Sequence, residues 1–275
     1  MPSPADPIAI AIGPFEIRWY AIFIILGVVA AVSLGAWIAG KRGRDPDFLL
    51  DISFWVVLAG IVGARLYYVL LEWDRFSHDP IAAFNLRSGG LTIHGAVIAG
   101  SIAIWFLCRR QDEPVFTWLD IIAPGAALGQ AIGRWGNWAN QEAFGTPSDL
   151  PWAVEIDPAR RPPGYESAST FHPTFLYESV FNLLNAAILT WIVVRGPANR
   201  WYRSGDGIGI YLIAYGVARF FIERIRTDSL YIGPWPAAYW LSFALIAAGI
   251  TVIIWRHSID SVREPSGGAA GEASV

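Results

Sequence analysis

The chain has 275 residues, a mean hydropathy of +0.41 and a formal net charge of -3 at pH 7. Only 16% of its residues are charged, against roughly a quarter in soluble domains, so the composition excludes an ordinary soluble protein and indicates an integral membrane protein. The slightly acidic balance offers no basic surface for nucleic acid. One cysteine, Cys108, excludes an internal disulfide framework, and the four scattered histidines lack the spacing of a metal site.

A helix needs about 20 mostly apolar residues to cross a bilayer core of about 30 Å. The sequence predicts seven such spans, at residues 17–40, 49–71, 91–108, 116–133, 173–194, 206–224 and 235–255. The fourth span is the weakest because it contains Asp120 and Pro124. We therefore predict an all-α integral membrane protein with one transmembrane domain over residues 1–255. The small and polar segment 256–275 is expected to be a disordered tail.

Basic residues in the connections predict the orientation of the spans, because they favour the cytoplasmic side. They gather after the first, third, fifth and seventh spans, as Lys41, Arg42, Arg44, Arg109, Arg110, Arg195, Arg200, Arg203, Arg256 and Arg263. This pattern places the N-terminus outside and the C-terminus inside. The two longest connections, 72–90 and 134–172, then lie outside, and we expect them to form a small extracytoplasmic cap.

Polar side chains in the predicted spans converge on the outer leaflet. Ionisable groups inside a membrane are expensive, so each one is a candidate for function. Under the predicted topology, six spans place such a group in their outer part: Tyr20, Arg65, His94, Arg134, Tyr177 and Arg219. Isolated structural ion pairs would have no reason to share one depth. The pattern therefore predicts a single site that opens outward, and its arginines suit an anionic head group.

The sixth predicted span repeats a polar residue every four positions, at Tyr211, Tyr215, Arg219 and Glu223, which places all of them on one helical face. Two interpretations are open. Arg219 and Glu223 could form a local ion pair that has no further role, or the guanidinium could bind phosphate, which we favour for Arg219.

His94 is the one histidine well inside a predicted span. Its imidazole could be held by a backbone carbonyl, or it could accept a proton from a substrate near neutral pH. Gly95 beside it would leave room for that substrate. Asp120, at the other end of its span, is expected to make either a helix-start bond or a structural bond.

Three glycines in the fourth span, Gly125, Gly129 and Gly133, are four residues apart. This spacing places them on one face, where the absence of side chains lets a neighbouring helix approach closely. We predict that this stripe serves packing.

The most concentrated polar segment is GRWGNWANQEAFG, residues 133–145. It closely resembles the signature of bacterial prolipoprotein diacylglyceryl transferases, Gly-Arg-x-Gly-Asn followed by Asn-x-Glu-x-x-Gly, with Trp138 where phenylalanine is commoner. The blocks RWY, GARLYYVL, GGLTIHG, LPWAVE, HPTFLYES and YGVARFFIERIRTDSL are also similar to family blocks and follow in the same order. The resemblance therefore covers most of the chain.

The resemblance implies an enzyme of the bacterial inner membrane with seven transmembrane helices and an extracytoplasmic cap. Such an enzyme moves the diacylglyceryl group of phosphatidylglycerol to the lipobox cysteine thiol of a preprolipoprotein and releases glycerol phosphate, as the first step of lipoprotein maturation. No metal or other cofactor is implied. His94 matches the expected base, and Arg134 and Arg219 match the catalytic phosphate-binding arginines. Expected substrate-binding residues, in addition to Arg134, are Tyr20, Arg65, Asn137, Glu142, Gly145, Tyr215 and Glu223.

Two other classes of membrane protein compete with the transferase. A transporter or lipid-binding protein could use buried arginines and a histidine to hold an anion or relay protons. It would be expected to carry polar residues into the inner halves of several spans, and these are mostly Ala, Ile, Val, Leu and Trp. No inverted repeat is apparent either. A purely structural membrane subunit would leave the outer polar cluster unexplained.

Overall fold

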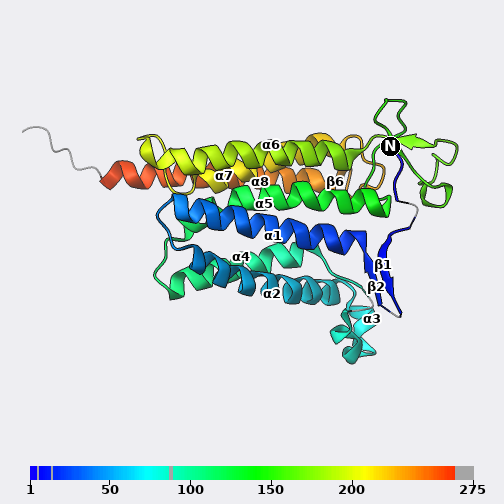
Figure 1. Cartoon of the computed structure of the whole chain (residues 1–275), viewed down its shortest axis with the longest axis horizontal. Coiled ribbons are helices and arrows are strands. Elements are labelled where there is room, and N and C mark those ends of the chain that lie inside the picture. Colours follow the sequence, from blue (N-terminus) through cyan, green and yellow to red (C-terminus); the bar gives the residue numbers. More distant parts are fainter. Residues whose placement is uncertain (5, 14, 87–88, 264–275) are drawn as a thin grey trace, which may run out of the picture. The chain divides into compact units, whose positions relative to one another are not determined.

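The computed structural model describes residues 1–4, 6–13, 15–86 and 89–263 (Figure 1). The chain forms two compact units: unit 1 comprises Met1–Leu34 and the chain from Leu119 onward, and unit 2 comprises Gly35–Trp118. The boundaries between the units fall inside two long helices, α1 (Trp19–Lys41) and α5 (Val115–Asn140). Each of these helices therefore contributes to both units.

Long helices make up most of the fold. Besides α1 and α5 they are α2 (Pro46–Leu71), α4 (Ile93–Arg110), α6 (Thr174–Arg195), α7 (Asp206–Glu223) and α8 (Ala237–Arg263). In the described part of the chain, six of the helices are long and apolar enough to cross a membrane, which makes this a multi-pass membrane protein. The sixth predicted span is also helical, as α7, but it is not among the six. Its 18 residues include the three charged residues Asp206, Arg219 and Glu223.

Two helices continue past their predicted ends. The fourth predicted span ends at residue 133, but α5 continues to Asn140, so Arg134 and Asn137 lie on the last turns of a helix and not in the following loop. The sequence did not predict this extension, because the signature contains glycines. Each glycine lowers the stability of a helix by about 1 kcal/mol relative to alanine. Helix α8 continues from the predicted end at 255 to Arg263. The rest of the predicted disordered tail, 264–275, lies outside the described residues.

Unit 2 is organised by the packing of α2 against α4. A side chain at Gly63 would overlap Gly95 and the Cβ of Ala99, and a side chain at Gly95 would overlap the Gly63 backbone. The two backbones touch here, so Gly95 leaves room for α2, and the room that we expected it to leave for a substrate is taken. The 72–90 connection forms α3 (Trp73–Ser77) and the 3-10 helix η1 (Pro80–Phe84).

Glycines also bring the helices of unit 1 together. Gly125 of α5 faces the backbone of Ala31, and Gly129 faces Gly27, so the predicted packing stripe is confirmed at these two positions. The third position is different, because no atom of the described residues lies within 4 Å of a side chain built at Gly133. Helices α7 and α8 also pack closely, at Gly209, Gly216 and Gly249.

Short strands lie at one end of the helices of unit 1 (Figure 1). They form three two-stranded antiparallel sheets: β1 (Ile8–Ile12) with β2 (Phe15–Arg18), β3 (Val154–Glu155) with β4 (Thr170–Phe171), and β5 (Tyr231–Ile232) with β6 (Trp235–Pro236). The connection between α5 and α6 also holds the short 3-10 helix η3 (Pro158–Arg160), and another one, η4 (Gly196–Ala198), follows α6. A small apolar core of Phe144, Val154, Ile156, Phe171 and Phe175 holds the α5–α6 connection together. The connection 72–90 belongs to the other unit.

Asp120 explains how one end of unit 1 is stabilised. It lies in α5 and is fully buried. Its carboxylate accepts hydrogen bonds from the backbone N–H groups of Gly205 and Ile208, both at 2.8 Å, and from the hydroxyl of Tyr202 at 2.6 Å. A carboxylate at a helix N-terminus satisfies free N–H groups and complements the helix dipole. Asp120 therefore has a structural role, as expected, and the helix start that it stabilises is that of α7 and not that of its own helix.

Candidate active site

Arg134 lies on the last turns of α5, where its side chain bridges two helices. Its guanidinium forms an ion pair with Glu178, in the second turn of α6, and donates a hydrogen bond to Asn137 Oδ1 at 3.3 Å. The Glu178 side chain is only 6% exposed, and that of Arg134 is 22% exposed. A buried carboxylate next to a guanidinium avoids the large cost of an isolated charge. The helical extension of α5 thus places the signature arginine against α6.

The end of the signature folds back on the helix that precedes it. Asn137 donates to Glu142 Oε1 at 2.8 Å, and Asn140 donates to the same oxygen at 3.4 Å. Gln141 and Ala143, on either side of Glu142, have φ values of 52° and 57°, which non-glycine residues seldom adopt. Such strain persists where the surrounding structure fixes the backbone. The segment therefore holds Glu142 against the asparagines that connect it to Arg134.

Two signature glycines allow close approach from other segments. A side chain at Gly136 would lie 2.6 Å from Cδ2 of the Tyr20 ring, at the start of α1. A side chain at Gly145 would lie 2.8 Å from both the Cβ of His172 and the carbonyl oxygen of Ile225. Gly145 also donates its N–H to the His172 carbonyl at 2.9 Å. Gly136 therefore admits Tyr20 beside Arg134, and Gly145 joins the segments that precede α6 and follow α7.

The C-terminal turns of α7 contribute the second arginine. Arg219 forms the predicted i,i+4 ion pair with Glu223, through one terminal nitrogen. Arg226, just beyond the helix, lies 3.9 Å from the same carboxylate and forms a closer ion pair with Asp228, at 2.7 Å. Glu223 is only 4% exposed. The local ion pair is therefore real, and the carboxylate of Glu223 sits between two guanidinium groups.

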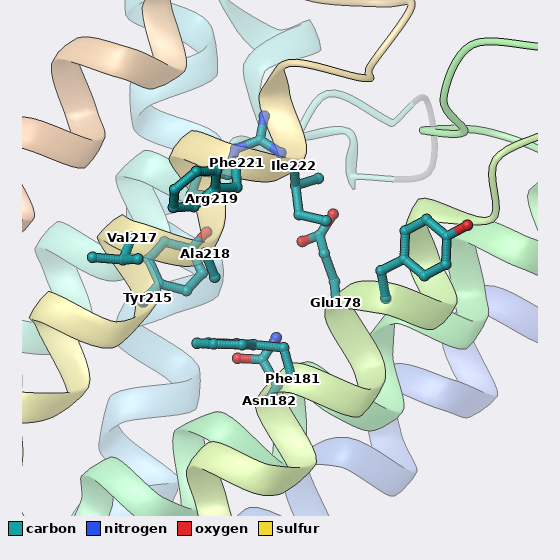
Figure 2. A pocket seen from close by; sticks show the side chains of 10 residues that line it. Glu178, Phe181, Asn182, Tyr215, Val217, Ala218, Arg219, Phe221 and Ile222 are labelled. Carbon is teal, nitrogen blue, oxygen red and sulfur yellow. The ribbon is translucent and has the colours of Figure 1, made fainter.

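A cavity of about 240 Å³ lies between α6 and α7. Figure 2 shows Glu178 and Asn182 from α6 on one side of it, and Tyr215 and Arg219 from α7 on the other. The rest of its lining is mostly apolar: Tyr177, Phe181, Val217, Ala218, Phe221 and Ile222. A small, mostly apolar cavity with a few converging polar groups is the usual form of a ligand site.

Several buried polar atoms of the residues that line this cavity have no hydrogen-bond partner within the described residues. They are Arg219 Nη1, Glu178 Oε1 and Asn182 Oδ1. An unpaired buried polar group costs about 1–3 kcal/mol, so such a cluster calls for an explanation. Sequence reasoning did not identify Asn182. The signal was present, because Glu178 and Asn182 are one turn apart in a mostly apolar span.

Buried polar residues also occur far from the cavity, toward the opposite end of the unit 1 helices. Asn185, about halfway along α6, is 6% exposed, and Asp120 and Asp206 are buried near the opposite end of unit 1. These parts of α5, α6 and α7 are mostly apolar, as expected, but they carry a few buried polar residues. Asp120 stabilises the start of α7, and Asp206 bonds His257 at 3.0 Å. These contacts show structural roles for the two aspartates.

The two remaining predicted site residues lie in unit 2. All five N–H donors of Arg65 bond to backbone carbonyls of the 72–90 connection, those of Ala82, Ala83, Asn85, Gly89 and Gly90. This arrangement gives Arg65 a structural role in ordering the connection. His94 lies in the first turn of α4, where its side chain is exposed and its ring centroid is 6.3 Å from that of Tyr67.

The structure thus brings together the predicted residues of unit 1 at one end of its helices: Tyr20, Arg134, Asn137, Glu142, Gly145, Tyr215, Arg219 and Glu223. Arg65 and His94 share one end of unit 2, where Thr92 donates to the carbonyl of Ala64 at 3.1 Å. Since the two groups belong to different units, their juxtaposition stays a prediction.

Comparison of the chain with known proteins identifies its family. Residues 7–255 match the family model described as prolipoprotein diacylglyceryl transferase. A protein of Synechococcus elongatus is 42% identical over 254 residues, covering 92% of this chain and 88% of the relative. One of Gloeobacter violaceus is 43% identical over 252 residues, covering 91% and 93%, and one of Finegoldia magna is 40% identical over 249 residues, covering 90% and 95%. All three relatives are named phosphatidylglycerol–prolipoprotein diacylglyceryl transferase. The chain belongs to the prolipoprotein diacylglyceryl transferase family.

Proposed function

We propose that this chain transfers the diacylglyceryl group of phosphatidylglycerol to the lipobox cysteine thiol of a preprolipoprotein. The observation that carries the proposal is the pair of arginines: Arg219 lines the cavity between α6 and α7, and Arg134 forms an ion pair with Glu178, which lines the same cavity. Family membership over residues 7–255 supports it, as do the relatives' names. A transporter has less support, because the deep aspartates of unit 1 are engaged in structural contacts.

The reaction needs a thiolate and a stabilised leaving group. The thiolate sulfur bonds to the terminal glyceryl carbon, and the bond between that carbon and the phosphate oxygen breaks. The phosphate takes the bonding electron pair and leaves as glycerol phosphate. Guanidinium groups in a site of low dielectric stabilise the charge on the departing phosphate. Arg219 Nη1, which has no partner among the described residues, is available for this contact.

His94 is our candidate for the base that takes the thiol proton. Its exposed ring near the start of α4 is accessible, and a neutral imidazole can accept a proton. Replacing His94 by Asn should lower kcat/KM for glycerol phosphate release. A His94→Asn enzyme with wild-type turnover would show that another group, or water, takes the proton.

Supporting roles fall to the neighbours of the arginines. Asn137 and Glu142 hold the signature segment in its folded-back form. Tyr20 lies against Gly136, and Gly145 joins the segments around α6 and α7. We further assign Tyr215 to the wall of the lipid site and Glu223 to the orientation of Arg219.

The proposal includes a membrane topology with seven crossings. Helix α7 spans the same depth as α6, because Gly207 near its start lies against Val193 near the end of α6, while its last turns line the cavity near the start of α6. Its 18 residues extend about 27 Å, close to the bilayer core of about 30 Å. The N-terminus would lie outside and the C-terminus inside the bacterial cytoplasmic membrane, with the 72–90 and 141–173 connections as the extracytoplasmic cap.

Cysteine labelling in intact cells tests this topology. Cys108, the one native cysteine, is buried and should stay unlabelled. An impermeant maleimide should label Asp149→Cys, in the α5–α6 connection, and should not label Arg200→Cys, which lies between α6 and α7. The opposite labelling pattern would reverse the orientation.

The activity is tested with purified protein, phosphatidylglycerol and a lipobox peptide, by following glycerol phosphate release. Release should require the peptide thiol and should be lost in Arg134→Ala and Arg219→Ala. The matched control is Arg224→Ala, because Arg224 is exposed and its guanidinium lies over the rings of Phe220 and Phe221. Equal loss in all three variants, or turnover in Arg134→Ala, would contradict the assignment.

A further inference from the structure

The cavity between α6 and α7 combines one buried donor with two buried acceptors. Arg219 Nη1 is the donor, and Glu178 Oε1 and Asn182 Oδ1 are the acceptors, each without a partner in the described parts of the chain. The residues Glu178 and Asn182 are 5% and 3% exposed. A group that is buried and unpaired in the folded protein is stabilised by a ligand that supplies the missing hydrogen bond.

The position of Glu178 is fixed by its second oxygen. Glu178 Oε2 is paired with Arg134, so Oε1 is the oxygen left for the cavity. Asn182 follows one helical turn later on the same face of α6. Figure 2 shows the ends of both side chains directed toward the space beside Tyr215 and Arg219. The two acceptors therefore form one short row opposite a cation.

A phosphate group alone does not match this arrangement. Phosphate oxygens would be attracted by Arg219 but repelled by the carboxylate of Glu178, and they offer no hydrogen to Asn182 Oδ1. A phosphate that carries hydroxyl groups matches both sides, because its anion faces the guanidinium and its hydroxyls donate to the two acceptors. The cavity volume of about 240 Å³ is below the roughly 300–1,000 Å³ of sites for larger ligands, so it suits a head group.

We propose that Asn182 and Glu178 accept hydrogen bonds from the free hydroxyl groups of the glycerol head group of the lipid donor. Asn182 is thereby a residue that determines the specificity of the enzyme for this head group. The inference rests on the proposed function, since glycerol phosphate is the leaving group of that reaction. A site built to bond a hydroxyl rejects an analogue that lacks it, because the buried acceptor is then left unpaired. The arginines bind any phosphodiester, and the acceptor oxygens of Glu178 and Asn182 select the lipid whose head group carries free hydroxyl groups.

The test compares two lipid donors in the same enzyme. Phosphatidylglycerol and phosphatidylpropanol carry the same charge and a three-carbon head group, but only the first has free hydroxyls. The wild-type enzyme should prefer phosphatidylglycerol in kcat/KM by roughly 10- to 100-fold. Asn182→Leu, an apolar replacement of similar size, should reduce this preference to less than about threefold by slowing the reaction of phosphatidylglycerol selectively.

The ratio of the two rates is insensitive to loss of folded protein, because both donors react with the same enzyme molecules. Asn185→Leu is the matched control, since Asn185 is also buried on α6 but does not line the cavity, and it should keep the wild-type ratio. Asn182→Gln, which retains an amide, should keep part of the preference. A wild-type ratio in Asn182→Leu, or a wild-type enzyme that accepts both donors equally, overturns the proposal. Absence of any thiol-dependent release by the wild-type enzyme would instead refute the proposed function.

Discussion

Gly136 gives the sharpest link between the signature and the geometry of the site. In Gly136→Ala the new methyl group would lie 2.6 Å from Cδ2 of Tyr20, against at least 3.4 Å in ordinary contact, so the ring must move by about 0.8 Å. A displacement on the order of 1 Å at a reacting site can lower turnover by about 100-fold. We expect kcat/KM for glycerol phosphate release to fall by that order, while the protein remains folded, because the tyrosine side chain is partly exposed and can move.

Gly133→Ala is the matched control within the same signature and the same helix. In the described part of the chain nothing lies within 4 Å of its added methyl group, and alanine is favoured over glycine in a helix by about 0.5–1 kcal/mol. This variant should retain wild-type turnover and unfold at a temperature higher by about 1–4 °C. A family pattern alone would predict damage at both glycines, so the two variants separate the structural argument from the pattern.

A double-mutant cycle completes the test. If the methyl group of Gly136→Ala acts by displacing the ring, it should cost little further activity in a Tyr20→Ala background. Additive losses in the double variant would refute the steric reasoning, as would full activity of Gly136→Ala or inactivity of Gly133→Ala.

Three further predictions concern stability and can be checked by thermal unfolding of the purified protein in detergent. Ala143→Gly should stabilise the fold by about 0.5–1 kcal/mol, because φ at this position is 57°, where glycine carries no steric penalty; an unchanged or lower unfolding temperature would contradict this. Asp120→Ala should destabilise it by at least about 3 kcal/mol, since the hydroxyl of Tyr202 and two backbone N–H groups lose a buried acceptor, and a shift as small as that of a surface variant would argue against it. Gly95→Ala should prevent accumulation of folded protein, because its methyl group would overlap the Gly63 backbone, and normal yield would show that α2 and α4 can separate there.

Helical periodicity explains which part of the fold could be predicted. The apolar runs gave the positions of all the long helices, because length and hydropathy are local properties. The prediction that Gly133 belongs to the packing stripe was wrong for a geometric reason. The residues of α5 that contact α1 are Gly125, Gly129 and Gly136, and their partners are Ala31, Gly27 and Tyr20. The contact thus advances by four residues and then by seven, as expected for 3.6 residues per turn. A strict step of four leaves the contact face.

Side-chain partners were harder to predict than positions. Arg134 and Arg219 were identified as site residues, but nothing in the sequence specifies that Glu178 is the carboxylate that faces Arg134. The partners of Arg65 were beyond prediction for a different reason, because they are backbone carbonyls, which every residue has. A polar residue inside a span shows that a hydrogen-bond or ion-pair partner is needed. The identity of that partner depends on the packing of the helices.

The two interpretations of Arg219 turn out to be compatible. Its ion pair with Glu223 is present, as the local interpretation expects, yet it engages one terminal nitrogen and leaves Nη1 unpartnered among the described residues. A guanidinium presents five donors in a rigid plane, so one edge can be held by a carboxylate while another contacts phosphate. The carboxylate also reduces the cost of keeping the cation in a site of low dielectric. Ion pairing in the folded protein is therefore a condition for placing an arginine at this depth, and it does not argue against catalysis.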